Sequence, residues 1–187
     1  MVGKEYCMNY NKLEENLTDV IIEAQLKLGY DGRSMSMNYP LGSLNRLLGT
    51  NADSSEMKQL LEGFADYVEG RFGRVGYSWH EGDIFRLTVP ETGVEYIHGL
   101  PADDSREFLA EFIGVVRQPG TTVEDVLSVF RKYSGKVHAE QSDSGEFDWL
   151  VYFEDGVPDD HYYCLTDEGI CVTYHRFTRE DYNDLGF

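Results

Sequence analysis

The sequence predicts an α+β fold in which N-terminal helices are followed by an antiparallel β-meander, a helix pair and a second antiparallel β-meander. Two observations predict it. Apolar residues recur every three to four positions in the first third of the chain and again around 108–130, which is typical of amphipathic helices. Between these stretches, and after them, apolar residues alternate with polar ones, which is typical of half-buried strands.

The first third of the chain is predicted to hold three helices. Apolar residues over 13–28 recur at helical spacing, and Gly29 is placed to end that helix. A shorter stretch with the same spacing covers 41–48, and Ser54 or Ser55 can cap a third helix after it.

Residues 75–79 and 85–89 change to a two-residue apolar period, which predicts a β-hairpin. Both apolar sets share one face only if the numbers of paired residues sum to an even value. We therefore expect Tyr77 opposite Phe85, with a three-residue loop in which Gly82 forms a bulge.

A third strand and two helices are predicted next. A Pro-Glu-Thr-Gly turn at 90–93 leads to a strand over 94–97. Helical spacing returns over 108–116 and again after Thr121 or Thr122, either of which can cap the second helix of this pair.

The remainder of the chain is predicted to form the second meander. If its last two strands are joined by the same kind of bulged turn as the first hairpin, His161 lies opposite His175. The predicted strands cover 136–141, 147–153, 161–165 and 170–177, with a short helical end near Arg179.

No Gly- or Ser-rich linker interrupts the sequence, so we expect a single domain over residues 1–187. Two stretches within it, 41–98 and 108–177, are possible pseudo-repeats. Each holds the pattern Leu-x-x-Phe-x-x-Tyr, beginning at Leu61 and at Leu127, followed by a predicted hairpin. The alternative is that Leu and Phe at helical spacing reflect core packing alone.

The charge balance excludes several classes of partner. The chain has 16 Lys and Arg against 34 Asp and Glu, a formal net charge of −18. Negative charge at this density repels phosphate backbones and anionic lipids, so we expect neither nucleic-acid nor membrane binding. No apolar stretch approaches the roughly 20 residues of a transmembrane helix, and residues 1–10 lack the apolar core of a signal peptide, so we expect a cytoplasmic location.

Cofactor motifs are absent from the sequence, because no phosphate-binding glycine loop, zinc-ribbon pattern or EF-hand spacing occurs in it. We therefore expect no cofactor. One metal site is conceivable: with His161 opposite His175 and Asp159 nearby, two imidazoles and a carboxylate could hold a divalent metal. The alternative is that both histidines are ordinary sheet-surface residues.

The C-terminal meander is the candidate partner-binding region. Residues 140–187 carry 13 acidic residues and two arginines, a net charge of −11, together with a cluster of aromatic residues. One face of the predicted sheet is too apolar for solvent, so either a helix covers it or a partner does. Acidic rims with aromatic anchors suit a basic protein partner, and the candidate contact residues are Tyr152, Asp159, Asp160, Tyr163 and Leu165.

Two segments carry a resemblance to known proteins. The segment from Met8 to Leu17, MNYNKLEENL, and the segment from Tyr39 to Thr50, YPLGSLNRLLGT, resemble an uncharacterised bacterial domain-of-unknown-function family. That resemblance implies no activity and no site residues. In acidity, size and α+β order the chain is also similar to immunity proteins that neutralise toxins, a likeness that no motif supports.

These observations favour a non-catalytic protein-binding or regulatory module. The rival hypothesis is an enzyme or small-ligand-binding protein that uses a cleft between two helix-sheet halves. A deep pocket that gathers His, acidic and Tyr side chains would favour the rival, whereas a shallow acidic surface would favour the binding module.

Overall fold

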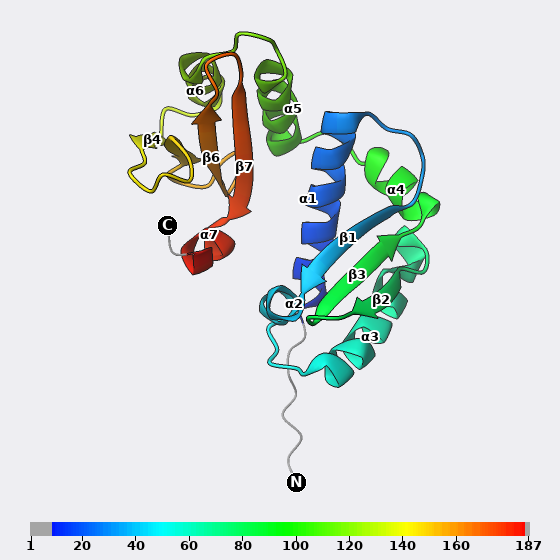
Figure 1. Cartoon of the computed structure of the whole chain (residues 1–187). Coiled ribbons are helices and arrows are strands. Elements are labelled where there is room, and N and C mark those ends of the chain that lie inside the picture. Colours follow the sequence, from blue (N-terminus) through cyan, green and yellow to red (C-terminus); the bar gives the residue numbers. More distant parts are fainter. Residues whose placement is uncertain (1–8, 186–187) are drawn as a thin grey trace. The chain divides into compact units, whose positions relative to one another are not determined.

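The structure, a computed structural model, describes residues 9–185 and divides the chain into two units, Met1–Leu100 and Pro101–Phe187 (Figure 1). The described residues form seven helices and two antiparallel sheets. The predicted α+β class is therefore confirmed. The single domain and its pseudo-repeats stay predictions, and each unit is described by itself.

Helices pack on a three-stranded sheet of order β1-β3-β2 in the N-terminal unit. All three helices predicted before residue 70 are present. The elements in chain order are α1 (Tyr10–Leu28), β1 (Met35–Pro40), α2 (Leu41–Leu48), α3 (Ser54–Phe72), β2 (Gly76–His80), β3 (Ile84–Val89) and α4 (Glu91–His98).

The start of α3 is fixed by a capping box that begins at Asp53, which precedes the predicted caps Ser54 and Ser55 by one and two residues. The Asp53 Oδ1 atom accepts hydrogen bonds from the backbone N–H groups of Ser55, at 2.8 Å, and Glu56, at 2.9 Å. The Glu56 carboxylate in turn accepts the Asp53 N–H at 3.0 Å. These reciprocal bonds satisfy donors that have no partner within the helix.

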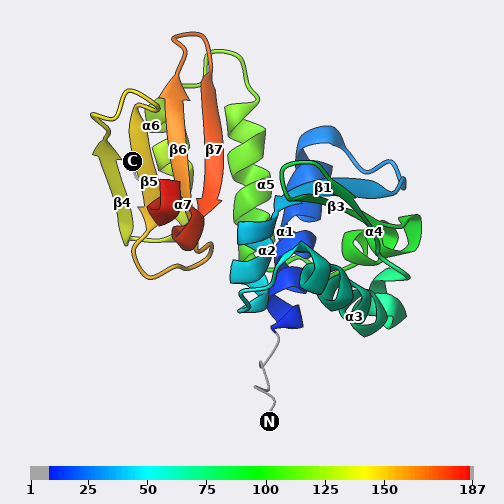
Figure 2. The same cartoon turned by 60° about the horizontal axis from the view of Figure 1, so that its bottom comes forward.

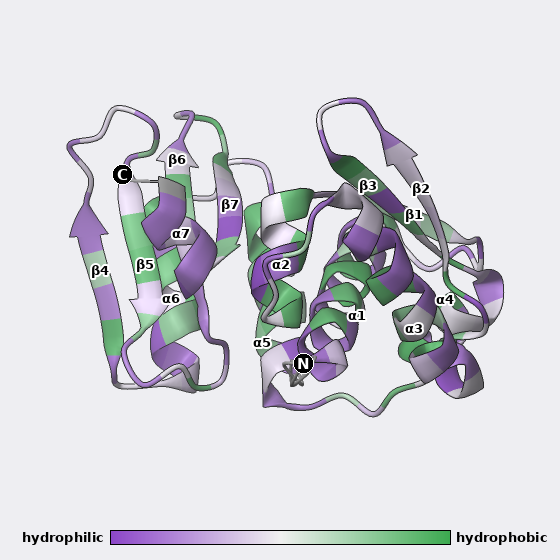
Figure 3. Ribbon diagram, turned by 90° about the horizontal axis from the view of Figure 1, so that it is seen from below, coloured by the Kyte–Doolittle hydropathy of each residue, from purple (hydrophilic) through white to green (hydrophobic). Residues whose placement is uncertain are grey.

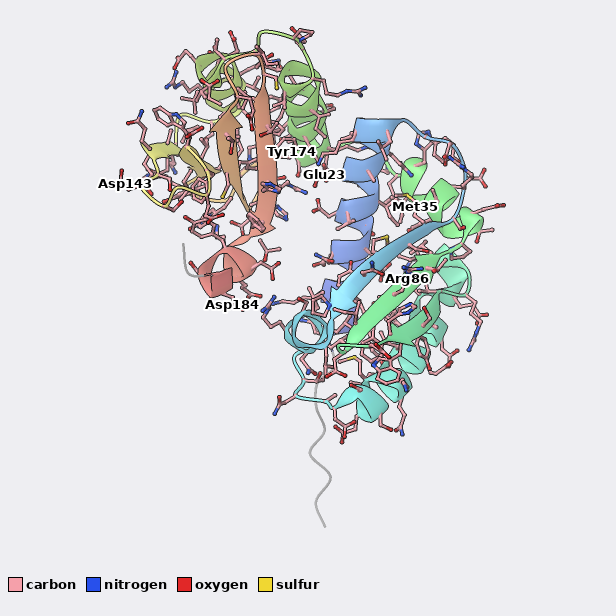
Figure 4. All side chains as sticks on the ribbon, in the orientation of Figure 1. Glu23, Met35, Arg86, Asp143, Tyr174 and Asp184 are labelled. Atoms are coloured by element: carbon pink, nitrogen blue, oxygen red, sulfur yellow. The ribbon has the colours of Figure 1, made fainter. Side chains whose placement is uncertain are left out.

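The core of the N-terminal unit lies between the helices and one face of the sheet. Phe85, Leu87 and Val89 on β3 are at most 1% exposed and pack with apolar residues of α1, α3 and α4. The opposite face is polar: Arg86, labelled in Figure 4, donates from Nε to Oδ1 of Asn38 at 3.1 Å. The sheet therefore has one buried and one polar face, as its sequence alternation indicates.

Two predictions for this unit are wrong. Residues 94–97 belong to α4 rather than to a strand, and the third strand of the sheet is β1, which we did not predict. In the hairpin, Tyr77 pairs with Leu87 and Trp79 with Phe85, a shift of two residues from the predicted register. Because the shift is even, the apolar residues keep their predicted face.

The C-terminal unit is a four-stranded sheet of order β4-β5-β6-β7, with α5 and α6 on one face and α7 on the other (Figure 2). The predicted helix pair, four strands and terminal helix are all present. Their bounds are α5 (Asp104–Val116), α6 (Val123–Tyr133), β4 (Val137–Gln141), β5 (Trp149–Phe153), β6 (His161–Asp167), β7 (Val172–Thr178) and α7 (Arg179–Leu185).

Aromatic rings fill the space between the helix pair and the sheet. Phe108, Phe112, Phe130, Phe153 and Tyr163 are all 0% exposed. Most of their contacts are edge-to-face; for example, the Phe108 and Phe153 ring centroids lie 4.9 Å apart at 76°. This geometry places the positive edge of one ring against the negative face of the next and adds to the gain from burial.

The other face of the C-terminal sheet holds a smaller apolar cluster. Phe147, Leu150 and Cys164 are buried there, and Tyr162 and Tyr182 pack against them. Tyr182 lies on α7, a helix whose residues are mainly hydrophilic (Figure 3). A helix therefore covers this part of the sheet, which is one of the two alternatives that the sequence left open.

The predicted pairing of the last two strands is wrong. His161 pairs with Thr178 and His175 with Cys164, a register three residues away from the predicted one. The loop between β6 and β7 has four residues, 168–171, instead of a three-residue bulged turn. An odd shift changes which residues of β6 and β7 share a face of the sheet, so Tyr174 lies opposite Leu165.

Candidate functional site

The most buried charge of the C-terminal unit is the carboxylate of Asp159, which is 2% exposed and lies two residues before His161 on β6. Its Oδ1 atom accepts the backbone N–H of His161 at 2.9 Å and lies 2.8 Å from Nδ1 of the His161 imidazole. Its Oδ2 atom accepts Nη2 of Arg176 at 2.6 Å and Oγ of Ser105 at 3.4 Å. One carboxylate thus joins β6, β7 and the start of α5.

Arg176 extends this network into the aromatic core. Its Nε donates to the Tyr163 hydroxyl at 3.0 Å, and its side chain is only 3% exposed. Charge-assisted bonds of this kind are stronger than neutral ones, and a guanidinium makes them in a fixed geometry. The network holds the last two strands in one register.

The environment of Asp159 keeps its carboxyl group ionised. Burial by itself would raise the pKa of this group, but the hydrogen bond from His161 and the charge of Arg176 outweigh burial and lower the pKa to about 2. Partnered charges can be buried, whereas isolated ones are neutralised. Asp159 is therefore an anion held inside the protein.

The contacts around Asp159 do not form a catalytic triad. In a Ser-His-Asp triad the hydroxyl bonds to the imidazole and the carboxylate orients the opposite ring nitrogen. Here the Ser105 hydroxyl bonds to the Asp159 carboxylate instead. The arrangement supports packing and strand register rather than the activation of a serine.

The predicted metal site required His161 to lie opposite His175, and the two residues do not pair in the structure. His161 and His175 lie on opposite faces of the sheet, because they pair with Thr178 and Cys164 respectively. Within residues 9–185, no three His, Cys, Asp or Glu side chains are grouped so that they could hold a metal ion.

The structure separates the five candidate partner-binding residues. Tyr163 and Leu165 are 0% exposed in the core and Asp159 is buried in its ion pair, so these three residues are not available to a partner and their assignment is corrected. Tyr152 is half-buried on the α7 side, with its ring 4.4 Å from that of Tyr162. Asp160 is exposed, and its Oδ1 atom lies 2.5 Å from Nε of Arg179.

An open acidic pocket, which we did not predict, lies elsewhere on this unit. It has a volume of about 480 Å³ and contains three aspartates, one half-buried tryptophan and no basic residue. Asp143, in the loop after β4, projects at the edge of the unit (Figure 4). The lining residues are Gln141, Ser142, Asp143, Asp148, Trp149, Asp167 and Gly169.

Two hydrogen bonds shape the wall of the acidic pocket. Asp148 Oδ2 accepts the backbone N–H of Asp167 at 2.7 Å, and Asp167 Oδ1 accepts the N–H of Gly169 at 2.8 Å. Asp143 is exposed and has no such role. The acidity of residues 140–187 indicated a charged surface here, but only the pairing of β5 with both β4 and β6 brings the three carboxylates around Trp149.

A family model matches residues 10–186, nearly the whole chain; its description is "Domain of unknown function, E. rectale Gene description (DUF3877)". The chain belongs to the DUF3877 family. The predicted resemblance to a bacterial domain of unknown function is thereby confirmed, and it extends well beyond the two segments that carried it. No curated protein and no solved structure matches this DUF3877 chain.

Membership of the DUF3877 family assigns no chemistry, so the acidic pocket and the Asp159 network have to be interpreted from their own geometry. None of the described helices of this DUF3877 domain combines the length and apolar character needed to cross a membrane. Of the two features, the Asp159 network is buried and the acidic pocket is open. The pocket is therefore the candidate functional site.

Proposed function

We propose that this protein is a non-catalytic binding module that captures a basic protein partner, with a Lys or Arg side chain of the partner entering the acidic pocket. The observation that carries the proposal is the lining of the pocket. Asp143, Asp148 and Asp167 surround one aromatic ring, that of Trp149, and no basic residue lines the pocket.

The chemistry of the pocket suits an organic cation. Three carboxylates that do not form a metal-binding group still attract an ammonium or guanidinium, which is larger and hydrogen-bonds to several oxygens. An indole ring adds a cation–π contact, and Trp is the aromatic residue that makes the strongest one. Trp149 therefore supplies both apolar area and attraction for a charged head group.

Long-range charge supports the same partner. The segment 101–187 holds 19 acidic and seven basic residues, a net charge of −12, against −6 for residues 1–100. Such a field accelerates the approach of a basic protein and repels an acidic one. The rival hypothesis of an enzyme stays a prediction.

A hexa-arginine peptide is a direct probe of the pocket. In a Trp79→Phe background, Trp149 is the only tryptophan, so its fluorescence reports binding at this site. We expect a saturable change in emission at low ionic strength that weakens in 0.5 M salt, where the screening length falls below about 5 Å. A hexa-glutamate peptide should give no change.

A matched pair of variants tests the location. Asp143→Asn removes one pocket charge and should weaken binding roughly two- to fivefold, the value of one exposed ion pair. Glu154→Gln makes the same charge change at an exposed position outside the pocket and should leave the affinity unchanged. Equal losses in the two variants would show that the peptide responds to net charge alone. No loss in either variant would show that Asp143 does not contribute to binding. Either result would overturn the proposal.

A further inference from the structure

The outer edge of β2 is an open sheet edge in the N-terminal unit. β2 is the last strand in the order β1-β3-β2, and Gly76, Ser78, Trp79 and His80 on it are exposed. In an antiparallel ladder, alternate N–H and C=O groups of an edge strand point away from the sheet. Within residues 9–185, nothing hydrogen-bonds to the backbone on this side of β2.

This edge lacks the protection that edge strands usually carry. Natural sheets block their edges with charged residues or proline. Three of the four edge strands among the described residues have such a group: β1 ends in Pro40, β4 contains Glu140 and β7 contains Arg176. β2, with the sequence GYSWH, has neither a charge nor a proline, although 27% of the residues in the chain are charged.

The sequence of β2 is complementary to itself when two copies run antiparallel. Only the register centred on Ser78 pairs all five residues, and it places Tyr77 opposite Trp79 of the other copy on one face. Gly76 then faces His80, and Ser78 faces Ser78, on the polar side. Aromatic pairs across a ladder are among the favourable ones, and no like charges oppose each other.

Charges beyond the two ends of the strand complement each other in the same register. Arg74 precedes β2, and in the twofold pairing it comes to the end of the ladder where the other copy turns from β2 into β3, a turn that holds Glu81 and Asp83. Arg74 is 57% exposed and already sits among acids, 2.9 Å from Glu62. Its guanidinium has five donors, so it can serve a further carboxylate.

The half-exposed aromatic residue of the edge gives this pairing its apolar area. Trp79 is 47% exposed, and Nζ of Lys58 lies over its ring, 4.4 Å from the ring centroid. An incoming strand would cover the ring from the side that no residue of β3 occupies. Tryptophan and tyrosine are the residues most enriched in interface centres.

We propose that two copies of this protein associate through β2, which joins their three-stranded sheets into one six-stranded antiparallel sheet around a twofold axis at Ser78. Such an isologous contact closes on itself, so the product is a dimer and not a filament. A single pair of five-residue strands is a small interface, which gives a dissociation constant of roughly 10–1000 μM.

Sedimentation of the full chain over that concentration range measures the association. The weight-average mass should rise from 21.4 kDa toward twice that value as concentration increases. A mass that stays at the monomer value up to about 1 mM would overturn the proposal.

Ser78→Glu is the variant that tests the interface. Ser78 pairs with Arg86 within its own sheet, so a carboxylate there is compatible with the monomer, whereas across the twofold axis it meets its own copy. We expect at least a tenfold weaker dimer, partly restored by high salt. Asn38→Glu is the matched control, because Asn38 flanks the same Arg86 from β1 on the same exposed face, and its dimer should match that of the unmodified chain.

A mixing experiment separates pairing at β2 from a general effect of charge. Ser78→Glu and Ser78→Lys proteins should each be monomeric alone and should form a mixed dimer together. A dimer that persists in Ser78→Glu, or that Asn38→Glu disrupts equally, is formed by another surface and would contradict the proposal.

Discussion

Asp159 and Arg176 form an ion pair inside the C-terminal unit: Oδ2 and Nη2 are 2.6 Å apart, and the two side chains are 1% and 3% exposed. The residues are 17 positions apart and lie at neighbouring strands, so the pair exists only in the observed register of β6 and β7. Buried pairs contribute less to stability than their attraction suggests, because both ions lose hydration. Removing one partner, however, leaves the other charge buried alone.

We expect Asp159→Asn to destabilise the C-terminal unit by about 3–5 kcal/mol, since Arg176 then remains buried without an anion. Urea unfolding followed by Trp149 fluorescence in the Trp79→Phe background measures this loss. Asp155→Asn is the matched control, because Asp155 pairs with Lys136 at 3.2 Å on the surface. That control should cost no more than about 1 kcal/mol, and a similar small loss for Asp159→Asn would contradict the structural role given to the buried pair.

The same carboxylate predicts a pH dependence of unfolding. The folded chain holds the pKa of Asp159 at about 2, against an ordinary value of 3.8. As pH falls, the unfolded chain therefore takes up this proton first, and the stability from Asp159 is lost between about pH 4 and pH 2. At about 1.4 kcal/mol per pKa unit, the loss is about 2 kcal/mol.

This loss can be isolated by comparing the unmodified chain with Asp159→Asn at each pH. Other acidic residues titrate in both proteins, so the difference between their free energies of unfolding reports Asp159. We expect the difference to be constant above about pH 4 and to shrink below it. A difference that does not change down to pH 2 would show that the folded chain does not depress this pKa.

The sequence predicted the faces of the first hairpin but not those of the last one, for a physical reason. Faces depend on the parity of the register, and parity depends on loop length. The 81–83 loop has three residues as predicted, whereas the 168–171 loop has four. Both loops contain a glycine with positive φ, Gly82 and Gly169, so composition did not distinguish them.

The missed helix α4 shows a signal that was present in the sequence. Val94 and Ile97 are both buried, and a spacing of three places them on one side of a helix but on opposite faces of a strand. Pro90 was taken for a turn residue, and in the structure it is the N-cap of α4. For the candidate site, acidity could be predicted from composition, but the convergence of Asp143, Asp148 and Asp167 depends on strand pairing that the sequence does not specify.

At Gly93, α4 approaches the end of α3 and the sheet closely. A Cβ atom on Gly93 would lie 2.6 Å from the carbonyl oxygen of Phe72 and 2.6 Å from Cγ1 of Val89. Because one of these neighbours is backbone, a methyl group can be accommodated only if α3 and α4 move apart. We expect Gly93→Ala to destabilise the N-terminal unit by about 1–3 kcal/mol, the usual cost of overpacking a core.

Gly70→Ala is the control within the same unit. Gly70 lies inside α3, and a Cβ atom there would meet nothing within 4 Å. Alanine is the better helix former, so this change should stabilise the unit by about 0.5–1 kcal/mol. Urea unfolding followed by Trp79 fluorescence in a Trp149→Phe background measures both variants. Opposite signs for the two substitutions are the expected result, and a stabilising Gly93→Ala would show that α4 does not pack against α3 as the structure has it.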